Sequence, residues 1–132
     1  MTITARGMAA GLVFASFVYA GCATAQGYPV KPIRIIVPYS PGGSTDVVMR
    51  ILAPRLTEIL GQTVVVENRP GGSSTIGLDV AAKSPPDGYT LGIPNLTFGA
   101  NPSLMKKMPF DTEKDFAPVT LVSIVTLVLT VL

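Results

Sequence analysis

The chain has 132 residues, with 10 Lys or Arg against 8 Asp or Glu, so its formal net charge is only +2. This balance, which includes no basic run, does not suit nucleic acid or an anionic membrane surface as a partner. The sequence contains no histidine and 1 cysteine, which excludes Ser-His-Asp and Cys-His catalytic sets, histidine-ligated metal and internal disulfides.

Residues 1–25 have the pattern of a secretory signal peptide. Arg6 precedes an apolar run, and an A-x-A cleavage site ends at Ala25. The apolar run is short for a transmembrane helix. Cys22 follows small residues, so a lipoprotein signal is the alternative, and the less favoured one because a tyrosine stands where such signals usually carry leucine. We expect export and cleavage after Ala25, which leaves residues 26–132 as the mature chain.

The first expected element of the mature chain is a strand over residues 33–37, a β-branched run bounded by prolines. Such a run is typical of a strand that is covered on both faces. Gly42 and Gly43 follow, and they allow a sharp turn whose N–H groups are not shielded by a Cβ. A turn at the carboxyl end of a strand is where an open α/β sheet tends to bind an anionic or polar ligand.

A helix is expected next, because apolar residues recur at helical spacing over residues 48–60. Ser44 or Thr45 is placed to cap it, and Gly61 to end it. Asp46 lies in the first turn, where an acid complements the positive helix end. We interpret Asp46 as structural, since a carboxylate facing an anionic ligand would repel it, whereas it can accept hydrogen bonds from nearby amides.

The same order of elements then repeats. Residues 63–67 predict a second strand, and residues 78–83 a short helix. Between them lies a second glycine turn with hydroxyl side chains, formed by Gly71, Gly72, Ser73 and Ser74. This turn taken alone is more often structural than a ligand clamp.

A third strand is expected over residues 89–93, followed by a loop over residues 95–99 that contains Asn95 and Thr97. Residues 101–107 predict one helical turn. Residues 119–132 are almost wholly apolar or threonine, and their β-branched content favours a buried strand.

Alternation of strands and helices predicts an α/β fold with parallel strands, which places both glycine turns at one edge of the sheet. Their N–H groups and hydroxyls could together hold a carboxylate without a salt bridge. Arg69 is the alternative anion partner, although a solvated surface arginine is the favoured reading. Neither turn has the spacing of a Walker loop, a dinucleotide fingerprint or a nucleophile elbow.

Four segments in register carry a family resemblance: residues 28–46, 66–72, 86–91 and 115–119. Together they resemble the Bug family of periplasmic solute-binding proteins, the receptors of tripartite tricarboxylate transporters. The resemblance implies the N-terminal part of a type II periplasmic binding fold, a parallel sheet with flanking helices, with the second domain missing.

The resemblance also implies a periplasmic receptor that binds a small organic acid and passes it to the membrane permease subunits, with no enzymatic activity, cofactor or metal. The turns and the third loop would supply the ligand-binding residues Tyr39, Ser40, Gly42, Gly43, Ser44, Thr45, Gly71, Gly72, Ser73, Ser74, Asn95 and Thr97.

Chains of this family are much longer, so we interpret residues 26–132 as an incomplete N-terminal portion of the solute-binding domain. The alternative hypothesis is a non-functional fragment that binds no ligand, with the apolar end at residues 119–132 as an aggregation liability. An exported enzyme is a third and weaker hypothesis, because the chain carries no nucleophile motif.

Overall fold

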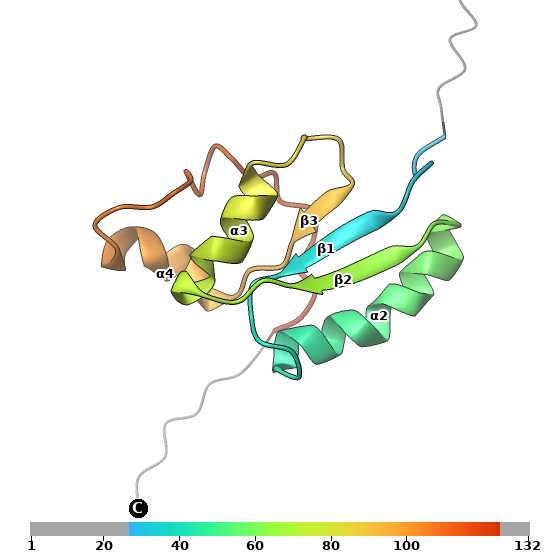
Figure 1. The fold of residues 1–132 in the computed structure, drawn as a ribbon, viewed down its shortest axis with the longest axis horizontal. Coiled ribbons are helices and arrows are strands. Elements are labelled where there is room, and N and C mark those ends of the chain that lie inside the picture. Colours follow the sequence, from blue (N-terminus) through green and yellow to red (C-terminus); the bar gives the residue numbers. More distant parts are fainter. Residues whose placement is uncertain (1–26, 125–132) are drawn as a thin grey trace, which may run out of the picture.

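The computed structural model describes residues 27–124. Its elements follow in the order β1 (Ile33–Val37), α2 (Ser44–Leu60), β2 (Val64–Asn68), the short 3₁₀ turn η1 (Gly72–Ser74), α3 (Thr75–Ala82), β3 (Thr90–Gly92) and α4 (Leu96–Leu104) (Figure 1). The predicted alternation of strands and helices is confirmed from β1 to β3. The signal-peptide prediction lies outside the described residues.

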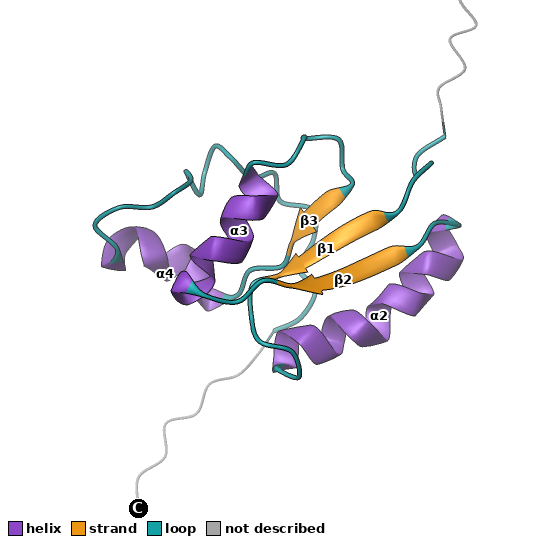
Figure 2. Ribbon diagram, in the orientation of Figure 1, coloured by secondary structure: helices purple, strands orange, loops and turns teal. Residues whose placement is uncertain are grey.

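The three strands form one parallel sheet in the order β2-β1-β3 (Figure 2). Val37, the last residue of β1, lies opposite Asn68, the last residue of β2. Because the strands are parallel and end in register, the turns that follow β1 and β2 leave from the same edge of the sheet. The prediction that both glycine turns lie at one edge is therefore confirmed.

The central strand β1 is buried on both faces, as its β-branched sequence predicts. Ile33 and Ile35 belong to the core cluster that also contains Met49 of α2. Side chains alternate along a strand, so Ile36 faces the opposite side, where α3 packs on β1 and β3. Figure 1 shows α2 and α3 on different sides of the sheet. The sheet is thus a middle layer between these helices.

Helix α2 begins earlier than a cap at Ser44 or Thr45 would allow. Gly43 is its N-cap, and no side chain caps it. The prediction that Ser44 or Thr45 caps the helix is wrong, because both residues already lie in its first turn. At the other end, Gly61 takes the left-handed conformation with φ 67° and donates its N–H to Thr57 O at 3.0 Å, as predicted.

Helix α4 replaces the expected loop after β3. Asn95 caps it, because its side-chain oxygen accepts the Thr97 N–H at 3.0 Å. The loop predicted over residues 95–99 is therefore wrong beyond Asn95, and the helical turn predicted over residues 101–107 is only the end of a helix that starts at Leu96. Within residues 27–124, no helix is both long and apolar enough to cross a membrane.

The strand predicted over residues 119–132 is wrong for the part that the structure describes. Residues 119–124 form no strand and are exposed, with Val119 at 79% and Ile124 at 82% exposure. Strand propensity reflects packing on a pleated, half-buried surface more than an intrinsic backbone preference. In the described residues, β1, β2 and β3 pair only with one another, so this segment has no ladder to join.

Candidate ligand-binding site

The first turn is held in place by a buried carboxylate. Asp46 is 2% exposed. It accepts the Gly42 N–H at 2.8 Å and the side-chain amide of Asn68 at 2.8 Å, and it pairs with Arg50 Nε at 3.0 Å. Asp46 therefore links the turn after β1, the start of α2 and the end of β2.

These contacts also set the charge of Asp46. The Arg50 guanidinium, followed by the Gly42 amide and the Asn68 side chain, lowers the pKa of Asp46 to about 2 from its usual 3.8. The carboxylate thus stays ionised at neutral pH, and Arg50 balances its charge. A nearby anion consequently meets a neutral pair instead of a free negative charge.

The amides of Gly42 and Gly43 are not free, contrary to expectation. Gly42 donates to Asp46, and Gly43 donates to Ser40 O at 3.3 Å. The free donors lie further along, at residues 44–46, whose N–H groups have no acceptor within residues 27–124. The first turn of a helix lacks internal acceptors, and these N–H groups carry the positive end of the helix dipole.

The second turn has an unusual left-handed backbone. Gly71, Gly72, Ser73 and Ser74 have φ angles of 124°, 56°, 52° and 76°. Glycine adopts such angles readily, but each serine there costs on the order of 1–3 kcal/mol. Strain of this kind persists only where surrounding contacts impose it, and it clusters at ligand sites. The N–H groups of Gly72 and Ser73 have no acceptor in the described chain, and the Ser74 N–H has none outside the 3₁₀ turn η1 itself.

Hydroxyl groups join these turns to the segment after β3. Thr97 Oγ1 lies 3.3 Å from Tyr39 Oη and 3.0 Å from Ser74 Oγ, and it donates to Asn95 Oδ1 at 2.9 Å. Tyr39 Oη also accepts the Asn95 N–H at 3.0 Å. The carboxyl ends of all three strands thus meet in one hydrogen-bonded cluster, here called the rim cluster: Tyr39, Ser74, Asn95 and Thr97.

The remaining predicted hydroxyls stand outside the rim cluster. They make no hydrogen bond to the described residues, and their residues are exposed or, for Thr45, half-buried: Ser40, Ser44, Thr45 and Ser73. Arg69 pairs with Glu67 at 2.6 Å, and Arg34 pairs with the same carboxylate at 2.7 Å. These pairs, Arg34 foremost, lower the pKa of Glu67. Arg69 is therefore engaged on the sheet surface.

Sequence reasoning missed two asparagines. Asn68 donates to Tyr39 O at 3.2 Å as well as to Asp46, so it fastens the two turns together. Its position at the carboxyl end of β2, at the edge where the turns meet, was a usable signal. Asn101 donates to Ser73 O at 2.8 Å from the far end of α4. No local sequence pattern points to that contact.

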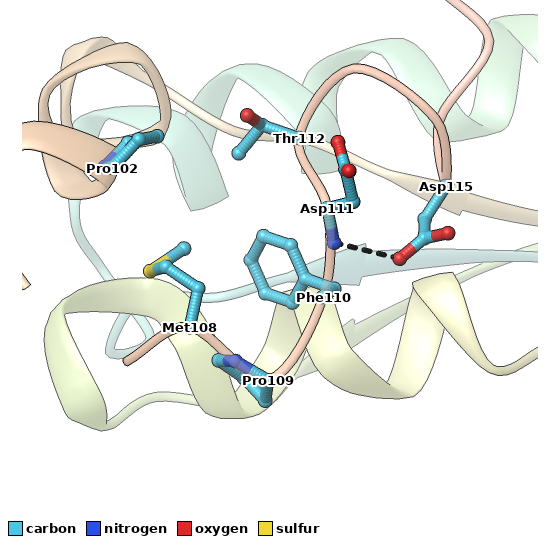
Figure 3. Close-up of a pocket in the computed structure, with 7 residues that line it drawn as sticks. All are labelled: Pro102, Met108, Pro109, Phe110, Asp111, Thr112 and Asp115. Carbon is cyan, nitrogen blue, oxygen red and sulfur yellow. Dashed lines mark hydrogen bonds between the residues drawn. The ribbon is translucent and has the colours of Figure 1, made fainter. Parts of the chain in front are cut away.

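A separate hollow of about 560 Å³ lies beside the end of α4 (Figure 3). It is lined by Pro102, Met108, Pro109, Phe110, Asp111, Thr112 and Asp115. The Asp111 N–H donates to the Asp115 carboxylate at 2.7 Å, and hydrogen bonds, first from the Glu113 amide, lower the pKa of Asp111. Asp111 also pairs with the Lys114 ammonium at 3.1 Å, so the charge of one of the two acidic side chains that line the hollow is balanced. Among the described residues, no group of three or more acidic, histidine or cysteine side chains could hold a metal.

A comparison with protein families identifies the family of this chain. Residues 48–132 match the model of the tripartite tricarboxylate transporter family receptor. The chain belongs to this family, whose members are periplasmic solute receptors.

Individual members of that family are similar to this chain in sequence and in structure. It is 45% identical to protein BugT of Bordetella pertussis over 121 residues, which are 90% of this chain and 37% of BugT. The structure of MatC from Rhodopseudomonas palustris with bound malate superposes with a TM-score of 0.68 at 36% identity, covering 72% of this chain and 33% of MatC. An R. palustris protein with adipate gives a TM-score of 0.62 at 36% identity, covering 66% of this chain and 29% of that protein. The chain thus spans about a third of the length of these relatives.

Proposed function

We propose that this chain provides one wall of a receptor site that holds a carboxylate group of a small organic acid. The donors are the N–H groups of residues 44–46 and 72–74, which have no acceptor in the described chain outside the 3₁₀ turn η1 itself. Helix N-termini and left-handed turns both direct N–H groups at anions. The observation that carries the proposal is the parallel register, which ends β1 and β2 side by side and brings both donor sets to one edge.

The chemistry of the donors favours a carboxylate over other ligands. Residues 39–46 and 71–77 contain no Lys or Arg, whereas phosphate sites commonly use such side chains. Amide N–H groups cannot accept hydrogen bonds, so they give a cation nothing to bind. The hydroxyl groups of the rim cluster, including those of Ser74 and Thr97, are uncharged and can add further donors.

Two relatives support small dicarboxylates as the ligand class, because their structures contain malate and adipate. The chain covers only 33% and 29% of those proteins, so the proposal stops at the class. The predicted residues Gly42 and Gly43 shape the first turn in this account, while their amides act within the protein.

We further propose that the receptor is exported, works in the periplasm and passes its ligand to the permease subunits of a tripartite transporter. It performs no catalysis. Mass spectrometry of the chain expressed with its N-terminus in a Gram-negative host tests the export step. A periplasmic product that begins at Gln26 supports it, and a diacylated Cys22 would show the lipoprotein alternative to be correct.

Calorimetric titration of residues 26–132 with malate and adipate tests the binding proposal, with adipamide as the matched neutral control. We expect saturable heat with the acids and none with the diamide. A folded chain that gives no heat with either acid would instead support the alternative of a fragment that binds no ligand.

A further inference from the structure

Asn101 is a buried polar residue of α4 that contacts the strained turn. It is 4% exposed, and its side-chain Nδ2 donates to Ser73 O at 2.8 Å. Ser74, the next residue of the turn, is 3% exposed. The hydrogen bond between Asn101 and Ser73 is therefore sheltered from water. A buried hydrogen bond is stronger than an exposed one, and removing its donor leaves the Ser73 carbonyl without a partner.

Because the peptide bond is planar, this contact also fixes the direction of the Ser74 N–H. In a trans peptide the C=O of one residue and the N–H of the next lie in one plane and point in opposite directions. Because Asn101 fixes the Ser73 carbonyl toward α4, the Ser74 N–H must point away from α4. Outside the 3₁₀ turn η1 itself, that N–H has no acceptor within residues 27–124.

The backbone at this peptide needs an external restraint. Ser73 has φ 52° and ψ 47°, and Ser74 has φ 76° and ψ −7°, values that serine adopts only under constraint. Two side-chain contacts from α4 reach the turn: Asn101 to the Ser73 carbonyl, and Thr97 to the Ser74 hydroxyl at 3.0 Å. Of these, only the first acts on the peptide that carries the Ser74 N–H.

We propose that Asn101 is a positioning residue for ligand binding, which keeps the Ser73–Ser74 peptide in its left-handed conformation and so aims the Ser74 N–H at the carboxylate. The proposal rests on the function proposed above. Asn101 itself does not touch the ligand.

The test compares Asn101→Ala with Asn101→Leu, which has a similar shape and no donor, and with Ser103→Ala as a control on the same helix. NMR titration with malate measures affinity, and the backbone chemical shifts of residues 73 and 74 report their conformation without any ligand. We expect both Asn101 variants to weaken malate binding roughly tenfold and to shift residues 73 and 74 out of the left-handed region, while Ser103→Ala changes neither.

A second substitution separates positioning from packing. Glycine adopts positive φ without strain, so Ser73→Gly in the Asn101→Ala background is expected to restore most of the lost affinity. Retained affinity in Asn101→Leu, or left-handed shifts at residues 73 and 74 in Asn101→Ala, would overturn the proposal.

The two proposals fail in different ways. If malate perturbs no amide of the unsubstituted chain, the proposed function fails. The chemical shifts of residues 73 and 74, compared without ligand between the unsubstituted chain and the Asn101 variants, still test whether Asn101 sets the conformation of the turn. Should Asn101→Ala not fold, the same comparison is made between Ser73→Gly and the double variant. A double variant that folds and keeps left-handed shifts at residue 74 supports the proposal, and one that fails to fold contradicts it.

Discussion

Gly77 is the point where α3 comes closest to the ends of the strands, and replacing it with alanine tests how the second turn is positioned. A Cβ at residue 77 would lie 2.6 Å from Arg69 O, 2.8 Å from Pro38 Cβ and 2.9 Å from Pro38 Cα. Two of these atoms belong to the backbone and the third to a rigid ring, so none can move aside alone. Alanine at this position must push α3 away from β1 and β2.

The magnitude follows from these distances. Nonbonded carbon atoms prefer a separation of roughly 3.5–4.0 Å, so relief of the contacts requires a shift of about 1 Å. Overpacking costs about 1–3 kcal/mol, and the rigid neighbours place this case in the upper half of that range. Alanine regains about 1 kcal/mol through its better helix propensity. We therefore expect Gly77→Ala to lower the free energy of unfolding by about 1–2 kcal/mol.

Gly99→Ala in α4 is the matched control, because a Cβ there meets nothing within 4 Å. It should raise the free energy of unfolding by up to about 1 kcal/mol. Urea unfolding followed by circular dichroism measures both variants, with the slope against urea expected to stay constant. Equal stabilisation by the two substitutions would show that α3 does not sit against Pro38 and Arg69 as described.

Three further predictions concern the two turns. Because the pKa of Asp46 is lowered, its ionised carboxylate stabilises the fold fully above about pH 4, and this stabilisation is lost as the pH falls through about 2. The difference in unfolding free energy between the wild type and Asp46→Asn should therefore shrink over that pH interval. A difference that does not depend on pH would contradict the assignment. Gly71→Ala places a Cβ 2.7 Å from Ile76 Cδ1 at φ 124°, so it should lose about 1–3 kcal/mol in urea unfolding, and unchanged stability would argue against the left-handed turn. Thr97→Val removes the hydroxyl at the centre of the rim cluster and should weaken malate binding roughly fivefold in calorimetry; unaltered affinity would remove the rim cluster from the site.

Local signals in the sequence predict the sheet and its first helix well. The β-branched run at β1, the apolar spacing of α2 and the left-handed glycine at residue 61 each depend on neighbours in sequence. Together with the parallel register, they place both turns at one edge. That placement follows from topology, which strand and helix alternation determines before any side chain is considered.

The donor set was not predictable in the same way. Glycine N–H groups look free in a sequence, but Asp46 reaches back to Gly42 and takes one of them. Serine rarely has positive φ, so the conformation of Ser73 and Ser74 depends on contacts from α4, which lies more than twenty residues further along the chain. Long-range restraints of this kind leave no local pattern.

An amide-resolved NMR titration of residues 26–132 with malate tests most directly whether the two turns form one anion site. The account predicts saturable shifts at residues 44–46 and 72–74 that follow a single binding curve, with adipamide producing none. Shifts confined to the acidic hollow at residues 108–115, or separate binding curves for the two turns, would contradict it.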